Sequence, residues 1–119
     1  MEKVNTEEEL GKIKEYWSPV IAAELNGQHV KFAKLKGEFP WHQHEKEDEM
    51  FFVIKGTITI EFRDKQIVLK ENEFIVVPRG TEHRPLAENE ASIMLFEPAA
   101  TINTGNVENE YTKKVLKRI

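Results

Sequence analysis

The sequence contains no cysteine. The lack of thiols excludes a disulfide framework, a cysteine nucleophile, and thiolate-bound zinc, iron–sulfur or blue-copper sites. Any metal that the chain binds must therefore be held by nitrogen and oxygen atoms. Serine is scarce as well, because Ser18 and Ser92 are the only two, and neither stands in the Gly-x-Ser-x-Gly pattern of a serine hydrolase. Phosphate-binding and dinucleotide-binding glycine motifs are also missing.

Long apolar runs and clusters of positive charge are absent too. The longest strongly apolar runs, residues 50–54 and 74–77, have the length of strands, and the acidic opening lacks the apolar centre of a signal peptide. The formal net charge is -4, and the lysines are spread along the chain, so no basic face for a phosphate backbone is present. We therefore expect a soluble cytoplasmic protein that binds neither nucleic acid nor membrane.

Short strand-like segments follow one another through the middle of the chain. Asn26-Gly27 joins two of them and indicates a hairpin, because both central residues of a type I′ turn need positive φ. Short strands separated by polar turns are typical of an all-β sandwich or barrel. Further strands are expected at residues 49–54, 57–62, 66–69, 74–77 and 92–97, with polar loops at residues 64–65, 70–73 and 87–90.

The two ends of the chain differ from this pattern. Thr6 followed by Glu9 has the form of a capping box, which predicts a short N-terminal helix with Thr6 as its N-cap that ends before Ser18-Pro19. Residues 99–119 show no clear period, and we expect a tail that packs on the barrel or on a partner subunit. At 119 residues the chain suits one domain, residues 1–119, with the barrel at about residues 20–98.

Three of the four histidines lie in two short segments. His42 and His44 are two residues apart, so in an extended backbone their rings project to the same side. Glu49 opens the apolar run that follows, and His83 ends the second segment. Imidazole and carboxylate groups are ligands for divalent first-row metals. The pattern predicts a metal centre made by His42, His44, Glu49 and His83.

These two segments resemble the two sequence motifs of the cupin family. The first motif is matched by Gly37, His42-Gln43-His44, Glu49 and Gly56, although its first spacer is four residues long where the family usually has five. The second motif is matched by residues 78–80 and His83. It departs from the family pattern at two positions, where Asn72 replaces the leading glycine and Ala87 replaces a frequent asparagine.

The cupin resemblance implies a fold and a type of site. The implied fold is a double-stranded β-helix, a barrel of the jelly-roll type. The three histidines and one glutamate would leave two adjacent coordination positions for water or substrate, on one divalent transition metal: iron, manganese, nickel, zinc, copper or cobalt. Short chains with both motifs are often described only as cupin-domain or mannose-6-phosphate-isomerase-like proteins, and that label describes the barrel.

Two functions are open at this stage. The first is an enzyme, an oxygenase, isomerase or lyase acting on a small molecule. The second is a non-catalytic module that binds or senses a metal or ligand, because no second acid–base residue is evident. Substrate contacts are expected from Phe51 and Val53, which share the face of Glu49 and equally suit a barrel core, and from Trp41 at the mouth. A homodimer is expected through the edge of the hairpin at residues 20–35.

The remaining polar residues near the motifs have simpler interpretations. We expect His29 to be an exposed residue beside the turn rather than a ligand. Residues 45–48 form an acidic stretch that could compete with Glu49 for a metal, but a solvated loop is the simpler interpretation. Arg79 and Arg84 flank His83, where they are either exposed arginines or a site for an anionic substrate.

Overall fold

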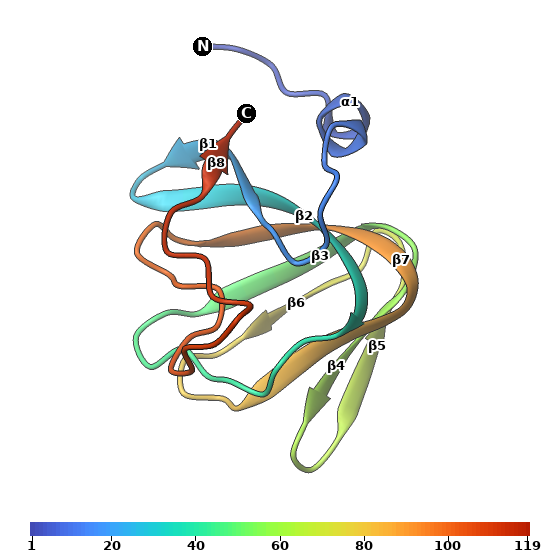
Figure 1. The fold of residues 1–119 in the computed structure, drawn as a ribbon, viewed down its shortest axis with the longest axis vertical. Coiled ribbons are helices and arrows are strands. Elements are labelled where there is room, and N and C mark those ends of the chain that lie inside the picture. The colour runs from blue at the N-terminus through green and yellow to red at the C-terminus, as the bar shows by residue number, and fades with distance from the viewer.

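A computed structural model describes residues 1–119 as an all-β protein with one short helix, as the sequence predicts (Figure 1). None of its helices is long and apolar enough to span a membrane. The helix is α1 (Thr6–Gly11), and the strands are β1 (Val20–Leu25), β2 (Gln28–Glu38), β3 (Glu49–Lys55), β4 (Ile58–Phe62), β5 (Gln66–Leu69), β6 (Phe74–Val77), β7 (His83–Pro98) and β8 (Lys117–Arg118).

Strand β7 is the centre of the sheet. It is 16 residues long and pairs antiparallel with β4 through its first part and with β2 and β3 through the rest. Figure 1 shows β2 and β7 curving together around the interior of the molecule. β6 pairs only with β3, and β5 only with β4, so each is an edge strand. The curved sheet therefore encloses a core, and β5, β6 and β8 lie at its edges.

The predicted loop at residues 87–90 is wrong, because these residues belong to β7. The strand stays paired on both sides of them, with Ala87 opposite Gly37 and Ala91 opposite Leu35. The register between the two strands shifts here, because the three exposed residues 88–90 of β7 lie opposite the single residue Lys36 of β2. Bulges of this kind bend a strand without ending it. The polar residues 88–90 thus lie on the exposed side of a bend in β7.

The predicted hairpin is confirmed. Asn26 and Gly27 have φ angles of 49° and 79°, and β1 and β2 pair on either side of them. Beyond the barrel the chain returns to this hairpin, where β8 pairs in parallel with β1 at Val20 and Ile21. The C-terminal tail therefore packs on its own barrel. It also covers part of the edge on which the expected dimer was based.

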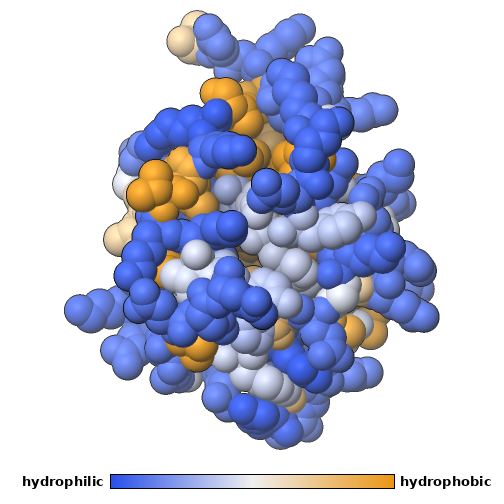
Figure 2. Space-filling view, viewed as in Figure 1, coloured by the Kyte–Doolittle hydropathy of each residue, from blue (hydrophilic) through white to orange (hydrophobic).

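The N-terminal helix is shorter than predicted, and its N-cap lies one residue earlier than predicted. The Oδ1 atom of Asn5 accepts a hydrogen bond from the Glu8 backbone N–H at 2.9 Å, so Asn5 rather than Thr6 is the N-cap. The helix ends at Gly11, while Leu10 and Ile13 pack on Phe32 of β2. Helix α1 thus covers part of the outer face of the sheet. In the view of Figure 2, the hydrophobic surface gathers in the upper half, around this end of the molecule.

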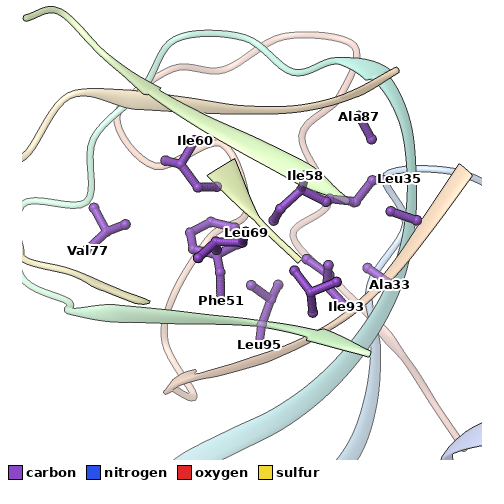
Figure 3. Close-up of a cluster of buried hydrophobic side chains, with 12 residues drawn as sticks. Ala33, Leu35, Phe51, Ile58, Ile60, Leu69, Val77, Ala87, Ile93 and Leu95 are labelled. Carbon is purple, nitrogen blue, oxygen red and sulfur yellow. The ribbon is translucent and has the colours of Figure 1, made fainter. Parts of the chain in front are cut away.

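The core fills the inner face of the sheet. Along β3 the side chains alternate as predicted, with Glu49, Phe51 and Val53 buried and the residues between them less so. Ile58 and Ile60 of β4 point into the same interior and are 1% and 0% exposed. Figure 3 shows these apolar side chains meeting between the strands. The only charged β3 residue on this inner face, Glu49, lies at the end of the core where the histidines gather.

Candidate metal centre

Four side chains meet at one end of the barrel. His42, His44, Glu49 and His83 each offer a ligand atom, and these atoms all lie within 4.8 Å of one another. The Oε1 atom of Glu49 is 3.4 Å from Nε2 of His44 and 3.3 Å from Nε2 of His83. Atoms bound about 2.1 Å from a common ion would be separated by about 3 to 3.5 Å. The cluster is therefore compatible with a metal site.

These ligand atoms have no other partner within the protein. Nε2 of His44, Nε2 of His83 and Oε1 of Glu49 are buried and accept or donate no hydrogen bond. Buried polar atoms are usually paired, because leaving one unpaired costs about 1–3 kcal/mol. A cation bound between these three atoms would give each of them a partner.

The backbone joins the two histidine segments at the ligands themselves. The His42 N–H donates to the His83 carbonyl at 3.0 Å, and the His83 N–H donates to the His42 carbonyl at 2.9 Å. Each ring is also oriented by a carbonyl two residues earlier: Nδ1 of His42 donates to Pro40 at 2.9 Å, and Nδ1 of His83 donates to Thr81 at 2.8 Å. With the proton on Nδ1, the lone pair of Nε2 is free for a metal.

The electrostatics favour neutral imidazole beside an ionised carboxylate. Burial, followed by the nearby His83, lowers the pKa of His42 to about 4, against the opposing effects of the Pro40 carbonyl and Glu49. Burial alone would raise the pKa of Glu49, but the close approach of its carboxylate to the His44 and His83 imidazoles holds that pKa well below its ordinary value. A divalent cation binds imidazole nitrogen and carboxylate oxygen in these same protonation states.

The acidic loop contributes no ligand to the cluster. Asp48 accepts hydrogen bonds from the Arg79 backbone N–H at 2.9 Å and from its Nε and Nη2 atoms, each at 3.2 Å. These bonds lower the pKa of Asp48 and engage its carboxylate with Arg79. Arg84 is likewise engaged, with its Nε atom 2.6 Å from Oε1 of Glu61. Both arginines beside His83 therefore already have carboxylate partners.

A small, mostly apolar cavity of about 40 Å³ adjoins the cluster. His42, Glu49 and Phe51 form part of its wall. Val53 is instead fully buried in the core, with 0% exposure. Trp41 lies outside the cavity and is held by Arg63, whose guanidinium carbon is 3.8 Å from the centre of its ring. The other lining residues are Trp17, Pro19, Ala33, Leu35, Phe39, Pro85, Ile93, Leu95 and Asn103.

Sequence reasoning missed two contributions to this end of the barrel. Trp17 and Asn103 line the cavity but come from the N-terminal connection and the C-terminal tail, which carry no local motif. The tail also covers the ligand loop, because Asn106 and Gln43 exchange two hydrogen bonds of 2.9 Å. Gln43 is the residue between His42 and His44. The C-terminal tail, which shows no sequence periodicity, is therefore hydrogen-bonded to the loop that carries His42 and His44.

The expectation that His29 is exposed is wrong. Its side chain is buried, with 6% of the residue exposed, because alternation along β2 turns it inward together with Lys31. It remains outside the four-residue cluster, and its Nε2 atom lies 3.7 Å from Oε2 of Glu24. The direction of the His29 side chain is therefore set by alternation along β2 and not by its position beside the Asn26-Gly27 turn.

Comparison with known proteins identifies the family. The family model described as Cupin domain matches residues 28–97, more than half of the chain, so the chain belongs to the cupin family. The uncharacterized protein YdbB of Bacillus subtilis is 39% identical over 74 residues, which cover 61% of this chain and 66% of YdbB. A crystal structure of a cupin-2 domain containing protein from Shewanella frigidimarina is similar, with 42% identity and a TM-score of 0.79 over 80% of this chain and 93% of that one.

More distant structures share the fold. Hydroquinone 1,2-dioxygenase PnpCD, crystallised with Cd²⁺ and 4-hydroxybenzonitrile, has a TM-score of 0.64 and 16% identity over 76% of this chain and 69% of that one. At this identity the likeness concerns the barrel alone. The similar proteins thus include an enzyme as well as a protein described as uncharacterized.

Proposed function

We propose that this cupin binds one divalent transition metal through His42, His44, Glu49 and His83. The observation that carries the proposal is the convergence of four buried ligand groups, three of whose atoms lack any partner. Three imidazole nitrogens and one carboxylate oxygen suit iron, manganese, cobalt, nickel, copper or zinc better than calcium or magnesium, which prefer oxygen ligands.

Metal content tests this proposal. Protein purified without a nickel column should contain about one transition metal ion per chain by elemental analysis. His44→Ala should lose most of that metal and keep a folded barrel by circular dichroism, because His44 is a proposed ligand. His29→Ala is the matched control, since His29 is also buried but lies outside the cluster. Equal metal content in the two variants would contradict the ligand assignment.

The proposed activity is that of a metal-dependent oxygenase, isomerase or lyase acting on a small molecule. Four protein ligands leave two positions open in an octahedral shell, where a bound metal would supply Lewis-acid or redox chemistry. The chain contributes the cavity, whose apolar wall includes Phe39 and Phe51 and whose volume is about 40 Å³. A volume of this size holds a small apolar group or a few water molecules.

A second candidate function is a binding or sensing module. It is favoured by the cavity wall, in which His42 and Glu49 are the only ionisable side chains. No further acid or base is therefore placed to move a proton there. A turnover screen with metal-loaded protein, covering oxygenase, isomerase and lyase substrates, distinguishes the two. Product formation that His44→Ala abolishes supports the enzyme, and ligand binding without product supports the module.

We further propose that the protein is a cytoplasmic homodimer assembled through the outer face of β3 and β6. Phe74 and Val76 of β6 are 57% and 54% exposed, although both are large and apolar. They lie opposite Phe52 and Met50 of β3 on the same face, and the rings of Phe52 and Phe74 stack at 6.4 Å. Exposed apolar surface of this kind is typical of a protein interface.

A further inference from the structure

The cavity beside the candidate metal centre reaches the surface at two residues. Twelve residues line it, and all but two of them are buried. The two that are only half-buried are Trp17, from the connection between α1 and β1, and Asn103, from the C-terminal tail. A molecule that enters the cavity from solvent must therefore pass these two side chains.

Trp17 is held in place by several contacts. Its backbone N–H donates to the Lys34 carbonyl and its Nε1–H to the Lys36 carbonyl, both at 2.9 Å. Its ring packs on Phe39, with 4.9 Å between the ring centres. The φ angle of Trp17 is 58°, a left-handed conformation that bulky residues rarely adopt. Backbone strain of this kind persists only where the surrounding structure enforces it, and it is common beside functional sites.

Asn103 is fixed by the tail in a similar way. Its Nδ2 group donates to the Tyr111 carbonyl, and its Oδ1 atom accepts from the Lys113 N–H, both at 2.8 Å. Both polar ends of this side chain are thus engaged, as is the indole N–H of Trp17. Apart from the proposed metal ligands, every polar side-chain group in the wall therefore already has a partner within the protein.

The chemistry and size of the cavity limit what it can hold. Phe51, Ile93 and Leu95 belong to its apolar wall, and Figure 3 shows them meeting between the strands. A charged group placed against such a wall would lose its hydration without gaining a partner. The cavity volume of about 40 Å³ is also well below the roughly 150 Å³ of an apolar cavity that holds benzene. These limits favour an uncharged group smaller than an aromatic ring.

We propose that the cavity binds a small, uncharged aliphatic part of the ligand, and that Trp17 determines specificity by setting the upper limit on its size. Trp17 is the larger of the two half-buried wall residues, and it is not one of the proposed metal ligands. The direction of the ligand, with its polar end toward His42 and Glu49, rests on the proposed metal centre. The size limit belongs to the cavity alone.

Binding of xenon and benzene to metal-stripped protein tests the size limit. Protein NMR follows the amide signals of Leu35 and Ile93, which lie in the cavity wall, and also shows whether each variant folds. We expect xenon, but not benzene, to shift these signals in the wild type. Trp17→Ala removes the indole ring, so benzene should bind at least about tenfold more tightly than to the wild type. Trp17→Leu is a milder change with the same expected direction, should the alanine variant not fold.

Trp41→Ala is the matched control, because Trp41 is also half-buried but lies outside the cavity, against Arg63. It should respond to xenon and benzene as the wild type does. Benzene binding by the wild type that equals binding by Trp17→Ala would overturn the size limit. A wild type that binds neither xenon nor benzene in this cavity would overturn the cavity as a ligand site.

Acetone and acetate, which are alike in size, test the preference for an uncharged group. At equal concentration, acetone should shift the signals of Leu35 and Ile93 in the wild type, and acetate should not. Acetate binding as strong as acetone binding would overturn this part of the proposal. All of these measurements use metal-free protein, so their outcome is separate from the metal content that tests the metal centre.

Discussion

At the scale of single residues, the site is defined by how each ligand is held. His42 and His83 each donate Nδ1–H to a backbone carbonyl of their own segment, so their rings are oriented by local backbone rather than by distant side chains. Glu49 is the opposite case, since the imidazole nitrogens that approach its Oε1 atom, those of His44 and His83, come from other segments. Two of the three imidazoles are therefore oriented by short-range structure, and the surroundings of the carboxylate are set by the fold.

The pKa of His42 leads to a prediction about stability. Because burial lowers it from 6.5 to about 4, the unfolded chain binds a proton at a higher pH than the folded metal-free protein does. The contribution of His42 to stability is thus full above pH 6.5 and is lost as pH falls toward 4. The loss amounts to about 3 kcal/mol at most, at 1.36 kcal/mol per pKa unit.

Urea unfolding of metal-free wild type and His42→Gln from pH 7 to pH 4 measures this effect. Taking the difference between the two proteins cancels the titration of other groups, including Glu97, whose raised pKa acts in the opposite direction. We expect the wild type to lose stability relative to His42→Gln as pH falls. A difference that stays constant across this range would show that His42 titrates normally.

At the scale of elements, the C-terminal tail acts as a clamp on the ligand loop. Asn106 pairs with the backbone of Gln43, and Tyr111 packs edge-on against Phe39, which in turn contacts His42. Thr104 between them is fully buried. The tail therefore belongs to the site, although it lies beyond the part of the chain that the family model matches.

Gly105→Ala should detach this clamp. A Cβ atom at Gly105 would lie 2.1 Å from the carbonyl oxygen of Gln43, and the φ angle of +55° is already unfavourable for alanine. We expect faster hydrogen–deuterium exchange in residues 101–112 and faster metal loss to a chelator. Gly27→Ala is the control, because Gly27 has a φ of +79° but nothing within 4 Å. Equal effects of the two substitutions on metal loss would argue against a clamp.

At the scale of the whole molecule, the barrel is uneven in how well its outer face is covered. Helix α1 covers the outer face around Phe32, whereas the outer face of β6 is covered by nothing in the chain. β6 is also an edge strand. A second copy seated on β3 and β6 would bury this surface, and it replaces the hairpin edge as the expected interface because β8 occupies part of that edge.

Phe74→Ser should shift the protein from dimer to monomer. The side chain is more than half exposed in the single chain, so the substitution should change the stability of the monomer little. Size-exclusion chromatography with light scattering measures the change. Val68→Ser is the control, since Val68 is 49% exposed on β5, away from the proposed interface. A wild type that is monomeric at all working concentrations would contradict the proposed dimer.

Features of the fold and site that depend on residues close together in the sequence could be predicted from the sequence. The hairpin, the alternation along β3 and the approach of His42 to His44 depend on neighbouring residues, and these predictions agree with the structure. Turn chemistry and the two-residue period of a strand are sufficient for them.

Long-range features could not be predicted in the same way. Lys31 alternates with apolar residues in the sequence and would ordinarily face water, yet it is buried because β7 supplies Glu97 beside it. The polar residues 87–90 predict a loop, and only the pairing of β7 with β2 shows that they form a bulge within β7. In each case the deciding partner is a strand far away in the sequence, and the register between strands is a property of the whole sheet.

The reciprocal backbone pairing of His42 with His83 has a final consequence. Because the two halves of the ligand set are joined by main-chain hydrogen bonds, we expect the site to keep its shape before an ion binds. An incoming ion then spends little of its binding energy on assembling the protein. Discrimination among ions would then depend on how well the preferred geometry of each ion matches this fixed arrangement, and on which ion the cell supplies.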